Sequence, residues 1–288
     1  MTSDVFSSAP VDLAGTTIIM SGGSRGIGEA IAVRAARDGA NVALLAKTFE
    51  PHPSLPGTIH TAAAAIEAAG GRALPLVGDI RDDAFVLDAV AQTAETFGGI
   101  DVVVNNASAI DLSRTEDLSM KKYDLMTSIN SRGAFLLAKA CIPWLRQSAN
   151  PHVLTLSPPI VLDPKWFTTA TAYTIAKFGM SLVTLGLAGE LREDGIAANS
   201  LWPRTAIDTA AVRNVLGGDL AARSRTPEIM ADAAHAIITR PSRELTGQFL
   251  IDDEVLEASG VADFSVYLNG GSEGDLALDF WVEPRRGR

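Results

Sequence analysis

The sequence predicts an α/β fold built on a doubly wound, seven-stranded, mostly parallel sheet with helices on both faces. Short apolar runs alternate along the chain with longer stretches of helical pattern, which is the order found in parallel βαβ sheets. The apolar runs are continuous in Val, Ile and Leu, as in strands that are buried on both faces. With 288 residues, 47% of them hydrophobic, the chain can form the large core that such a sheet requires.

Seven segments have the composition of buried strands, and six stretches between or after them have the apolar spacing of helices. The first helix is expected to end at Gly39, because glycine commonly terminates helices. The predicted strands are residues 16–20, 41–47, 73–79, 100–108, 152–157, 195–202 and 247–253. The predicted helices are residues 26–38, 58–69, 84–97, 120–147, 172–192 and 227–239.

Three segments interrupt this alternation. Residues 50–57 form a Pro-rich loop, and residues 203–226 form a long polar connection that is a candidate lid over a site, since long ordered loops are often functional. A Gly/Ser linker begins at Asn269. We therefore expect a single domain over residues 1–268 and a C-terminal tail over residues 269–288, which either docks on the core or on another subunit, or forms a surface arm.

A glycine-rich turn, SGGSRGIG, follows the first predicted strand and opens the first predicted helix. Glycines this dense destabilise a helix or strand interior, but they let backbone turn sharply and approach a bulky ligand. Strand, glycine turn and helix together are the context of a Rossmann-type dinucleotide site, in which the helix N-terminus faces the pyrophosphate. The spacing alone is a weak signal, because a tight turn without a ligand has the same pattern.

The end of the second predicted strand indicates which dinucleotide binds. An NAD site usually has an acidic residue there, which holds the ribose 2′-hydroxyl. Here Ala46 and Lys47 occupy the place, and Arg25 lies within the glycine turn. Each cation alone is compatible with a solvated surface charge, but two cations without a carboxylate favour a 2′-phosphate and therefore NADP(H).

Tyr173 and Lys177 are four residues apart on a predicted helix and therefore share a face. Lowering the pKa of a Tyr from about 10 to neutrality takes roughly 4 kcal/mol. An ammonium about 4 Å away supplies energy on the order of 4 kcal/mol at an effective dielectric constant near 20. The pair is therefore a candidate proton donor and acceptor, and a Tyr beside a Lys on a helix surface is the alternative for this hexapeptide alone.

In combination, these motifs resemble those of the short-chain dehydrogenase/reductases over residues 13–267. The segment GDI resembles the family's adenine contact, and NNAS resembles its NNAG segment with Ser108 in place of the glycine. The resemblance implies an NADP-binding catalytic domain with a Rossmann fold. The cofactor-binding residues that it implies are Ser21, Gly22, Ser24, Arg25, Gly26, Ile27, Gly28, Lys47, Asp79, Ile80, Asn106, Ala107, Ser108, Tyr173, Lys177 and Pro203.

The same resemblance implies four catalytic residues. In reduction, the nicotinamide gives a hydride to a carbonyl carbon and Tyr173 gives the proton. Lys177 lowers the pKa of Tyr173 and holds the nicotinamide ribose. Ser157 donates a hydrogen bond to the developing alkoxide, and Asn130 anchors a water that relays protons to Lys177.

The chain departs from the family pattern at two places. The family's strand commonly ends in Ser-Ser, but LTLSPP has Pro158 in the second place and leaves Ser157 sixteen residues before Tyr173. Ser157 is assigned as the alkoxide donor, and the alternative is that it points into the core and that a water or Asn130 replaces it. After the sixth strand the family's Pro-Gly is Pro203–Arg204, so a basic side chain is expected near the cofactor or the substrate mouth.

The resemblance implies an oxidoreductase that transfers a hydride between NADP(H) and a carbonyl or secondary alcohol, with an apolar ketone or a fatty or steroidal alcohol as the expected substrate. One alternative is a nucleotide-binding module with little or no turnover, which the Ser-Pro change supports. Another is an NADPH-dependent enoyl reductase, which the Tyr-Lys spacing of four disfavours. Segments such as LSPP and LWPRTAI are similar to a branch whose members carry an added sterol-carrier domain. This chain stops before any such domain, so we expect no lipid-carrier role.

Composition narrows the expected partners and compartment. A net charge of -10 argues against nucleic acid, and a single cysteine, Cys141, excludes an intrachain disulfide. With no apolar signal segment or membrane span evident, a cytoplasmic protein is expected.

Four scattered histidines predict no metal site, and the resemblance implies a homodimer or homotetramer built on helices 120–147 and 172–192. Trp166, Phe167 and Trp202 are candidates either for an apolar substrate pocket or for ordinary core packing.

Overall fold

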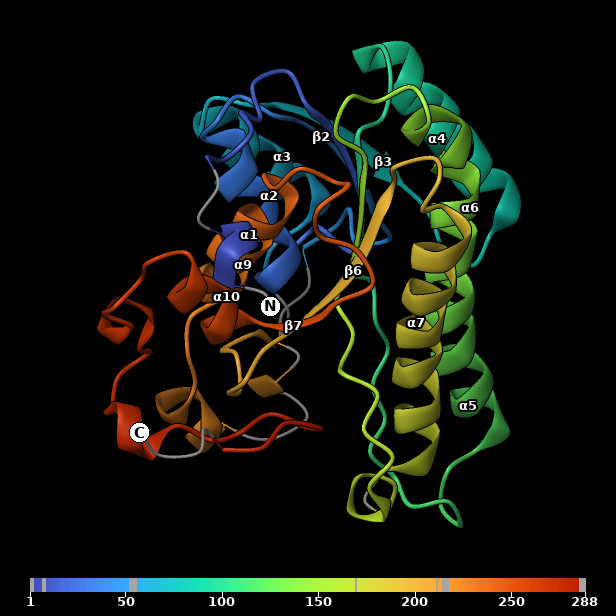
Figure 1. Cartoon of the computed structure of the whole chain (residues 1–288). Coiled ribbons are helices and arrows are strands. Elements are labelled where there is room, and N and C mark those ends of the chain that lie inside the picture. The colour runs from blue at the N-terminus through green and yellow to red at the C-terminus, as the bar shows by residue number, and fades with distance from the viewer. Residues whose placement is uncertain are drawn as a thin grey trace.

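A computed structural model describes residues 3–6, 9–51, 56–168, 170–210, 212–213 and 218–284. Seven parallel strands form one sheet in the order β3-β2-β1-β4-β5-β6-β7, which confirms the predicted fold class (Figure 1). Parts of the predicted Pro-rich loop (52–55), of the lid (211 and 214–217) and of the C-terminal tail (285–288) lie outside the described residues. The strands are β1 (Thr17–Ser21), β2 (Asn41–Ala46), β3 (Arg72–Val77), β4 (Val102–Asn105), β5 (His152–Thr155), β6 (Ala197–Trp202) and β7 (Phe249–Ile251).

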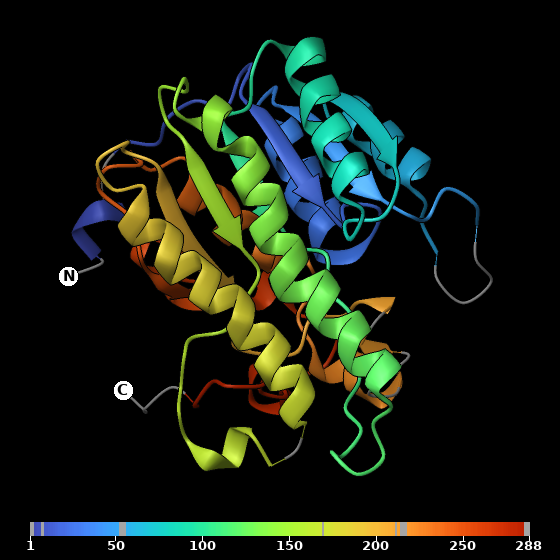
Figure 2. The same cartoon turned by 90° about the vertical axis from the view of Figure 1, so that its right-hand side faces the viewer.

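Helices cover both faces of the sheet (Figure 1). Figure 2 shows α4, α6 and α7 lying side by side across one face. The helices of this layer are α4 (Asp83–Phe97), α5 (Met120–Thr127), α6 (Gly133–Leu145) and α7 (Thr171–Glu190). Those packed on the other side are α2 (Gly26–Ala36), α3 (Ile59–Ala68), α9 (Glu228–Ile238) and α10 (Asp252–Ala258), with the short α1 (Ser3–Phe6) beside α10. Short 3₁₀ turns lie at Pro164–Trp166, Gly218–Arg223, Ser265–Tyr267 and Glu273–Asp275.

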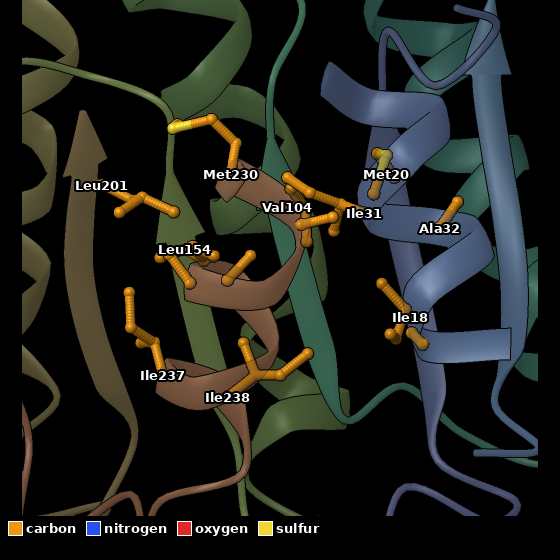
Figure 3. Packing of buried hydrophobic residues seen from close by; sticks show 14 of the residues in the cluster. Ile18, Met20, Ile31, Ala32, Val104, Leu154, Leu201, Met230, Ile237 and Ile238 are labelled. Atoms are coloured by element: carbon orange, nitrogen blue, oxygen red, sulfur yellow. The ribbon is translucent and has the colours of Figure 1, made fainter. Parts of the chain in front are cut away.

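The core has one apolar layer on each face of the sheet. Figure 3 shows the layer beneath α2 and α9, where Ile18 and Val104 of the sheet lie opposite Ile31 of α2 and Ile237 of α9. Cys141 is fully buried in the other layer, and burial raises the pKa of its thiol well above the ordinary value. Helix α7 is long and apolar enough to span a membrane by length and composition, but 61% of its apolar window is buried inside the protein, as in a core helix.

Several predicted elements differ in extent from the structure, and three of the differences affect the site. The helix predicted over residues 120–147 contains a π-helical turn at Ser128–Arg132, which places Asn130 in the interior. The fourth strand ends at Asn105, and the following residues turn across the end of the sheet. The seventh strand ends at Ile251, because Asp252 accepts a hydrogen bond from the backbone N–H of Arg204 and begins α10.

The strand order places β1 and β4 side by side at the centre, where the chain's direction of winding reverses. Loops that follow neighbouring strands diverge at such a point and leave a crevice at their carboxyl ends. In Figure 2 the segments that follow the strands gather at this end of the sheet, together with the C-terminal segment drawn in red. This end of the sheet is therefore the expected position of a ligand site.

Candidate active site

A cavity of ≈ 440 Å³ lies at the carboxyl end of the sheet. It extends from the glycine turn after β1 to Tyr173 and Lys177 of α7. The predicted site residues that line it are Gly22, Ser24, Arg25, Gly26, Ile27, Lys47, Asp79, Ile80, Asn106, Ala107, Ser108, Tyr173, Lys177 and Pro203. Ser21, Gly28, Asn130 and Ser157 are not among its lining residues.

The glycine turn and the turn after β4 form one interlocked unit. Ser21 Oγ accepts hydrogen bonds from the backbone N–H groups of Asn106 and Ala107, at 3.3 and 3.2 Å. The Asn106 side chain donates to the Gly22 carbonyl at 2.8 Å, and a Cβ at Gly28 would stand 2.5 Å from that same amide nitrogen. Ser21 and Gly28 therefore support the cavity wall from behind it.

The N-terminus of α2 faces this cavity. Its N-cap residue, Arg25, makes no side-chain capping hydrogen bond, and the first residues of the helix line the cavity wall. Gly26, with φ of 58°, adopts the left-handed conformation that favours glycine. A helix N-terminus beside bare backbone is the arrangement that binds a pyrophosphate.

The two predicted cations stand at the far end of the cavity. Lys47 Nζ lies 3.1 Å from Asp79 Oδ2, and Arg81 makes a bidentate contact with the same carboxylate. The Arg81 contact holds the pKa of Asp79 well below its usual range. Arg25 donates from Nη2 to the Gly57 carbonyl at 3.1 Å. The Lys47 side chain remains 60% exposed, so a phosphate can reach it.

Tyr173 and Lys177 meet at the opposite end and are only 5% and 3% exposed. Lys177 Nζ donates to the Leu156 carbonyl at 2.8 Å and lies 5.0 Å from the centre of the Trp202 ring. Burial lowers the pKa of Lys177 to about 7, against the opposing effect of nearby Asp279. Tyr173 and Lys177 both line the cavity, so they share a face of α7, as expected from their spacing of four residues.

The pKa of Tyr173 differs from the sequence-based expectation. Burial raises this pKa above its ordinary value, Asp279 acts in the same direction, and a hydrogen bond with the Ser108 side chain lowers it. Loss of hydration is the largest influence on this pKa, and the Lys177 ammonium is directed to the Leu156 carbonyl, so the expected lowering by Lys177 is not seen in this arrangement.

The structure does not bring Ser157 to Tyr173. Ser157 is fully buried, and its Oγ lies 2.8 Å from Ser200 Oγ. The chain turns directly after β5, where the Ser157 N–H donates to the Thr155 carbonyl, and this turn directs the side chain toward β6. The hydroxyl that does contact Tyr173 belongs to Ser108, in the turn after β4.

Asn130 fastens the turn after β4. Its Oδ1 accepts from the Ala109 N–H at 2.8 Å, and its Nδ2 donates to the Ala109 carbonyl at 3.1 Å. The side chain is fully buried, and the role of Asn130 in anchoring a water beside Lys177 stays a prediction.

The C-terminal segment completes the cavity. The predicted tail is therefore docked on the core over these residues, which is one of the alternatives expected for it. Asp279 and Phe280 line the cavity, and Trp281 packs beneath it with its ring centre 5.5 Å from that of Tyr173. The segment is fastened by the Trp202 indole N–H, which donates to the Phe280 carbonyl at 2.9 Å. The apolar stretch LALDFWV was the only sequence signal for this contact, and it did not say where the stretch would dock.

Arg204 fastens the same segment and does not line the cavity. Its guanidinium contacts both oxygens of Asp253 at 2.9 and 2.8 Å, pairs with Glu254, and donates to the Glu283 carbonyl at 2.9 Å. The expectation of a basic group at the cofactor or the substrate mouth is therefore wrong, since partners on α10 hold this side chain in the interior.

The aromatic candidates divide between the cavity and the core. Trp202 lines the cavity, whereas Trp166 and Phe167 pack against the neighbouring aromatic cluster. Among the residues that the structure describes, no group of three or more His, Cys, Asp or Glu side chains is placed to hold a metal ion.

Asp279 is expected to make the stability of the folded protein depend on pH. Burial raises the pKa of this carboxyl to about 7, and it faces Lys177, Tyr173 and Asp252. Because the folded-state pKa lies above the unfolded value, the stability that this group contributes is full at low pH and is lost as the pH rises through about 7. We expect Asp279→Asn to melt at a higher temperature than the wild type, with a gap that widens by about 1 kcal/mol or more between about pH 5 and pH 8.

Thermal melts across this pH range measure the gap. The matched control is Asp275→Asn, at an exposed carboxylate in the same segment. Parallel stability profiles for the wild type and Asp279→Asn would show that Asp279 does not titrate in this range.

Comparison with known proteins assigns a family to this arrangement. The chain matches the short chain dehydrogenase family model over residues 16–217. It is 58% identical over 255 residues to hydroxysteroid dehydrogenase-like protein 2 of Danio rerio, and this match covers 88% of the chain and 61% of that protein. The chain thus spans about three fifths of the length of this curated relative, which typifies the branch whose segments it resembles.

Solved structures show the same fold. A short chain dehydrogenase of Mycobacterium thermoresistibile has 57% sequence identity and a TM-score of 0.89, and the match covers 94% of this chain and 96% of that chain. A metagenomic short-chain oxidoreductase solved in complex with NADP has 24% identity and a TM-score of 0.69, over 83% of this chain and 97% of that chain. This chain belongs to the short-chain dehydrogenase/reductases, a family of oxidoreductases that use NAD(P)(H).

Proposed function

We propose that this protein transfers a hydride between NADP(H) and a carbonyl or secondary alcohol. The observation that carries the proposal is one continuous cavity, with a helix N-terminus and the cations Arg25 and Lys47 at one end and the buried pair Tyr173 and Lys177 at the other. NADP(H) has its 2′-phosphate at one end, its pyrophosphate in the middle and its nicotinamide at the other end. A single cavity of this kind is therefore suited to hold both ends.

The residues present fit NADP(H). The N–H groups at the start of α2 would hold the pyrophosphate, and Lys47 with Arg25 would hold the 2′-phosphate. When bound, the nicotinamide supplies or accepts the hydride. Tyr173 would donate a proton to the substrate oxygen during reduction and accept it during oxidation. Lys177 would stabilise the tyrosinate and hold the nicotinamide ribose.

The cavity also supports an apolar substrate. Near Tyr173 its wall consists largely of apolar side chains, and such walls favour ligands with hydrocarbon surface over compact polar ones. The residues concerned are Ile110, Ile129, Leu156, Trp202, Ile207 and Phe280. We propose a hydrophobic ketone or secondary alcohol, which is consistent with the hydroxysteroid dehydrogenase-like name of the relative.

Exposed apolar side chains on α6 and α7, among them Phe135 and Leu182, support self-association through these helices.

The cofactor preference is tested through Lys47. We expect the wild type to bind NADPH more tightly than NADH, because a hydrogen bond to a charged group contributes about 1.5–3 kcal/mol, or roughly 10- to 150-fold in affinity. Lys47→Ala is expected to remove most of this preference by weakening NADPH binding while leaving NADH binding nearly unchanged. Fluorescence titration with both cofactors measures the two affinities.

A control separates this effect from the general loss of a positive charge. Lys121→Ala removes an exposed lysine of α5 outside the cavity and is expected to leave both affinities unchanged. Equal affinity of the wild type for NADPH and NADH would rule out the NADP assignment while leaving the family's oxidoreductase chemistry in place.

A further inference from the structure

We propose that Ser108, in the turn after β4, has taken over the role of the family's serine after β5 and binds the substrate oxygen together with Tyr173. The inference rests on the proposed hydride transfer and deepens it. It concerns the residue that stands where the family has the glycine of NNAG. Three features of the structure support it, and they come from different elements of the fold.

The first feature is the position of the Ser108 hydroxyl. Ser108 is exposed at the cavity wall, where Tyr173 and Lys177 also lie. Both residues line the cavity, and the Ser108 side chain is near enough to Tyr173 for a hydrogen bond between them to lower the pKa of Tyr173. A substrate oxygen that accepts a hydrogen bond from Tyr173 therefore lies within reach of a second donor. Two donors converging on one oxygen are what stabilise an alkoxide as it develops.

The second feature is that Ser157 is engaged elsewhere. Its hydroxyl pairs with Ser200, and Ser200 Oγ donates onward to Thr184 Oγ1 at 3.2 Å. All three side chains are fully buried, so this chain of hydroxyls joins β5, β6 and α7 inside the core. Pro158, next along the chain, has neither a side-chain donor nor a backbone N–H. The β5 end therefore offers the cavity no hydroxyl.

The third feature is the rigid mounting of Ser108. On one side of it, the Ala107 N–H donates to Ser21 Oγ at 3.2 Å. On the other side, Ala109 is held through both its N–H and its carbonyl by Asn130. Donors fixed before the reaction need no reorganisation as charge develops. Asn130 thus acts as a positioning residue, because its π-helical turn fixes the backbone beside Ser108.

The chemical step follows from this placement. In reduction a hydride adds to the carbonyl carbon, the C=O π electrons move to oxygen, and Tyr173 transfers its proton to that oxygen. Ser108 keeps its single proton and donates it in a hydrogen bond to the same oxygen during the step. When no substrate oxygen is present, the same O–H can instead donate to the Tyr173 oxygen, which favours the tyrosinate.

The test compares Ser108→Ala with Ser157→Ala in the full chain. With NADPH and a panel of apolar ketones, Ser108→Ala is expected to lower kcat by about 10²-fold or more, with NADPH affinity unchanged. Ser108→Thr, which keeps a hydroxyl, is expected to recover a large part of that loss. Ser157→Ala is expected to lower the melting temperature and to leave kcat within about twofold of the wild type, because it breaks a buried hydrogen bond outside the cavity.

The opposite pattern would overturn the proposal. If Ser108→Ala turned over at the wild-type rate, or if Ser157→Ala lost turnover while remaining folded and bound to NADPH, the β5 serine would be the donor after all. Melting temperature and NADPH titration verify the fold of each variant, so a misfolded protein is not mistaken for a catalytic defect.

A second measurement does not depend on turnover. Tyrosine absorbance is titrated against pH with NADP⁺ bound, and the Tyr173→Phe variant identifies the contribution of Tyr173. Ser108→Ala is expected to raise the pKa of Tyr173, and Ser157→Ala is expected to leave it unchanged. If no ketone is reduced by the wild type, the proposed function fails, yet this titration still decides the Ser108 contact. An unchanged Tyr173 pKa in Ser108→Ala would refute it.

Discussion

Tyr173→Phe is expected to reduce turnover by about 10²- to 10⁴-fold, the usual contribution of a positioned proton donor. The substitution removes the transferable proton and leaves a ring of nearly the same shape. That ring still packs against Trp281, and Lys177 keeps its hydrogen bond to the Leu156 carbonyl. We therefore expect the variant to fold and to bind NADPH with wild-type affinity. Initial rates of NADPH oxidation with an apolar ketone measure the loss.

A matched control uses a tyrosine outside the cavity. Tyr123→Phe, on α5, removes the same atom and is expected to leave turnover unchanged. Wild-type turnover by a folded, NADPH-bound Tyr173→Phe variant would exclude Tyr173 as the proton donor. Loss of NADPH binding in that variant would instead show that Tyr173 acts mainly in holding the cofactor.

Trp281→Ala is expected to lower the free energy of unfolding by about 3–5 kcal/mol, as large aromatic truncations in a core do. Trp281 is only 2% exposed, and its ring centre lies 5.5 Å from those of Tyr173 and Trp202. Removing it leaves a void directly behind the catalytic tyrosine. We expect turnover to fall as well, because Tyr173 would lose the wall that fixes its ring. Chemical denaturation monitored by circular dichroism measures the stability change.

The control for this truncation lies three residues away. Leu278 is 44% exposed in the same segment, and Leu278→Ala is expected to change stability by about 0.5 kcal/mol or less. If Trp281→Ala were no more destabilising than Leu278→Ala, then the C-terminal segment would not be an integral part of the core.

The sheet and the cofactor end of the cavity were predictable because they depend on local patterns. Apolar runs define the strands. Gly22 and Gly28 cannot be replaced without a clash, because backbone or side-chain atoms lie within 3 Å of the position that a Cβ would occupy. The spacing of Tyr173 and Lys177 places both on one helix face whatever the rest of the chain does. Each of these predictions needed information from fewer than about ten neighbouring residues.

The donor to the substrate oxygen and the back wall of the cavity were not predictable in this way. The direction of the Ser157 side chain depends on Ser200, 43 residues away, and the docking of Trp281 depends on Trp202 and on Arg204. No local sequence pattern predicts either of these contacts. The resemblance to the family pointed to Ser157 from its position in the sequence, whereas our proposal of Ser108 depends on which hydroxyl lies beside Tyr173.

The docking of the C-terminal segment has a consequence for the order in which the protein matures during synthesis. Chains are made from the N-terminus, and domains begin to fold as they emerge. The glycine turn and the seven strands of the sheet precede residue 252, whereas Asp279 and Phe280 follow them in the sequence. A nascent chain can therefore assemble its sheet before the segment behind Tyr173 has been synthesised. The wall of the cavity beside Tyr173 should thus be the later of its two ends to form.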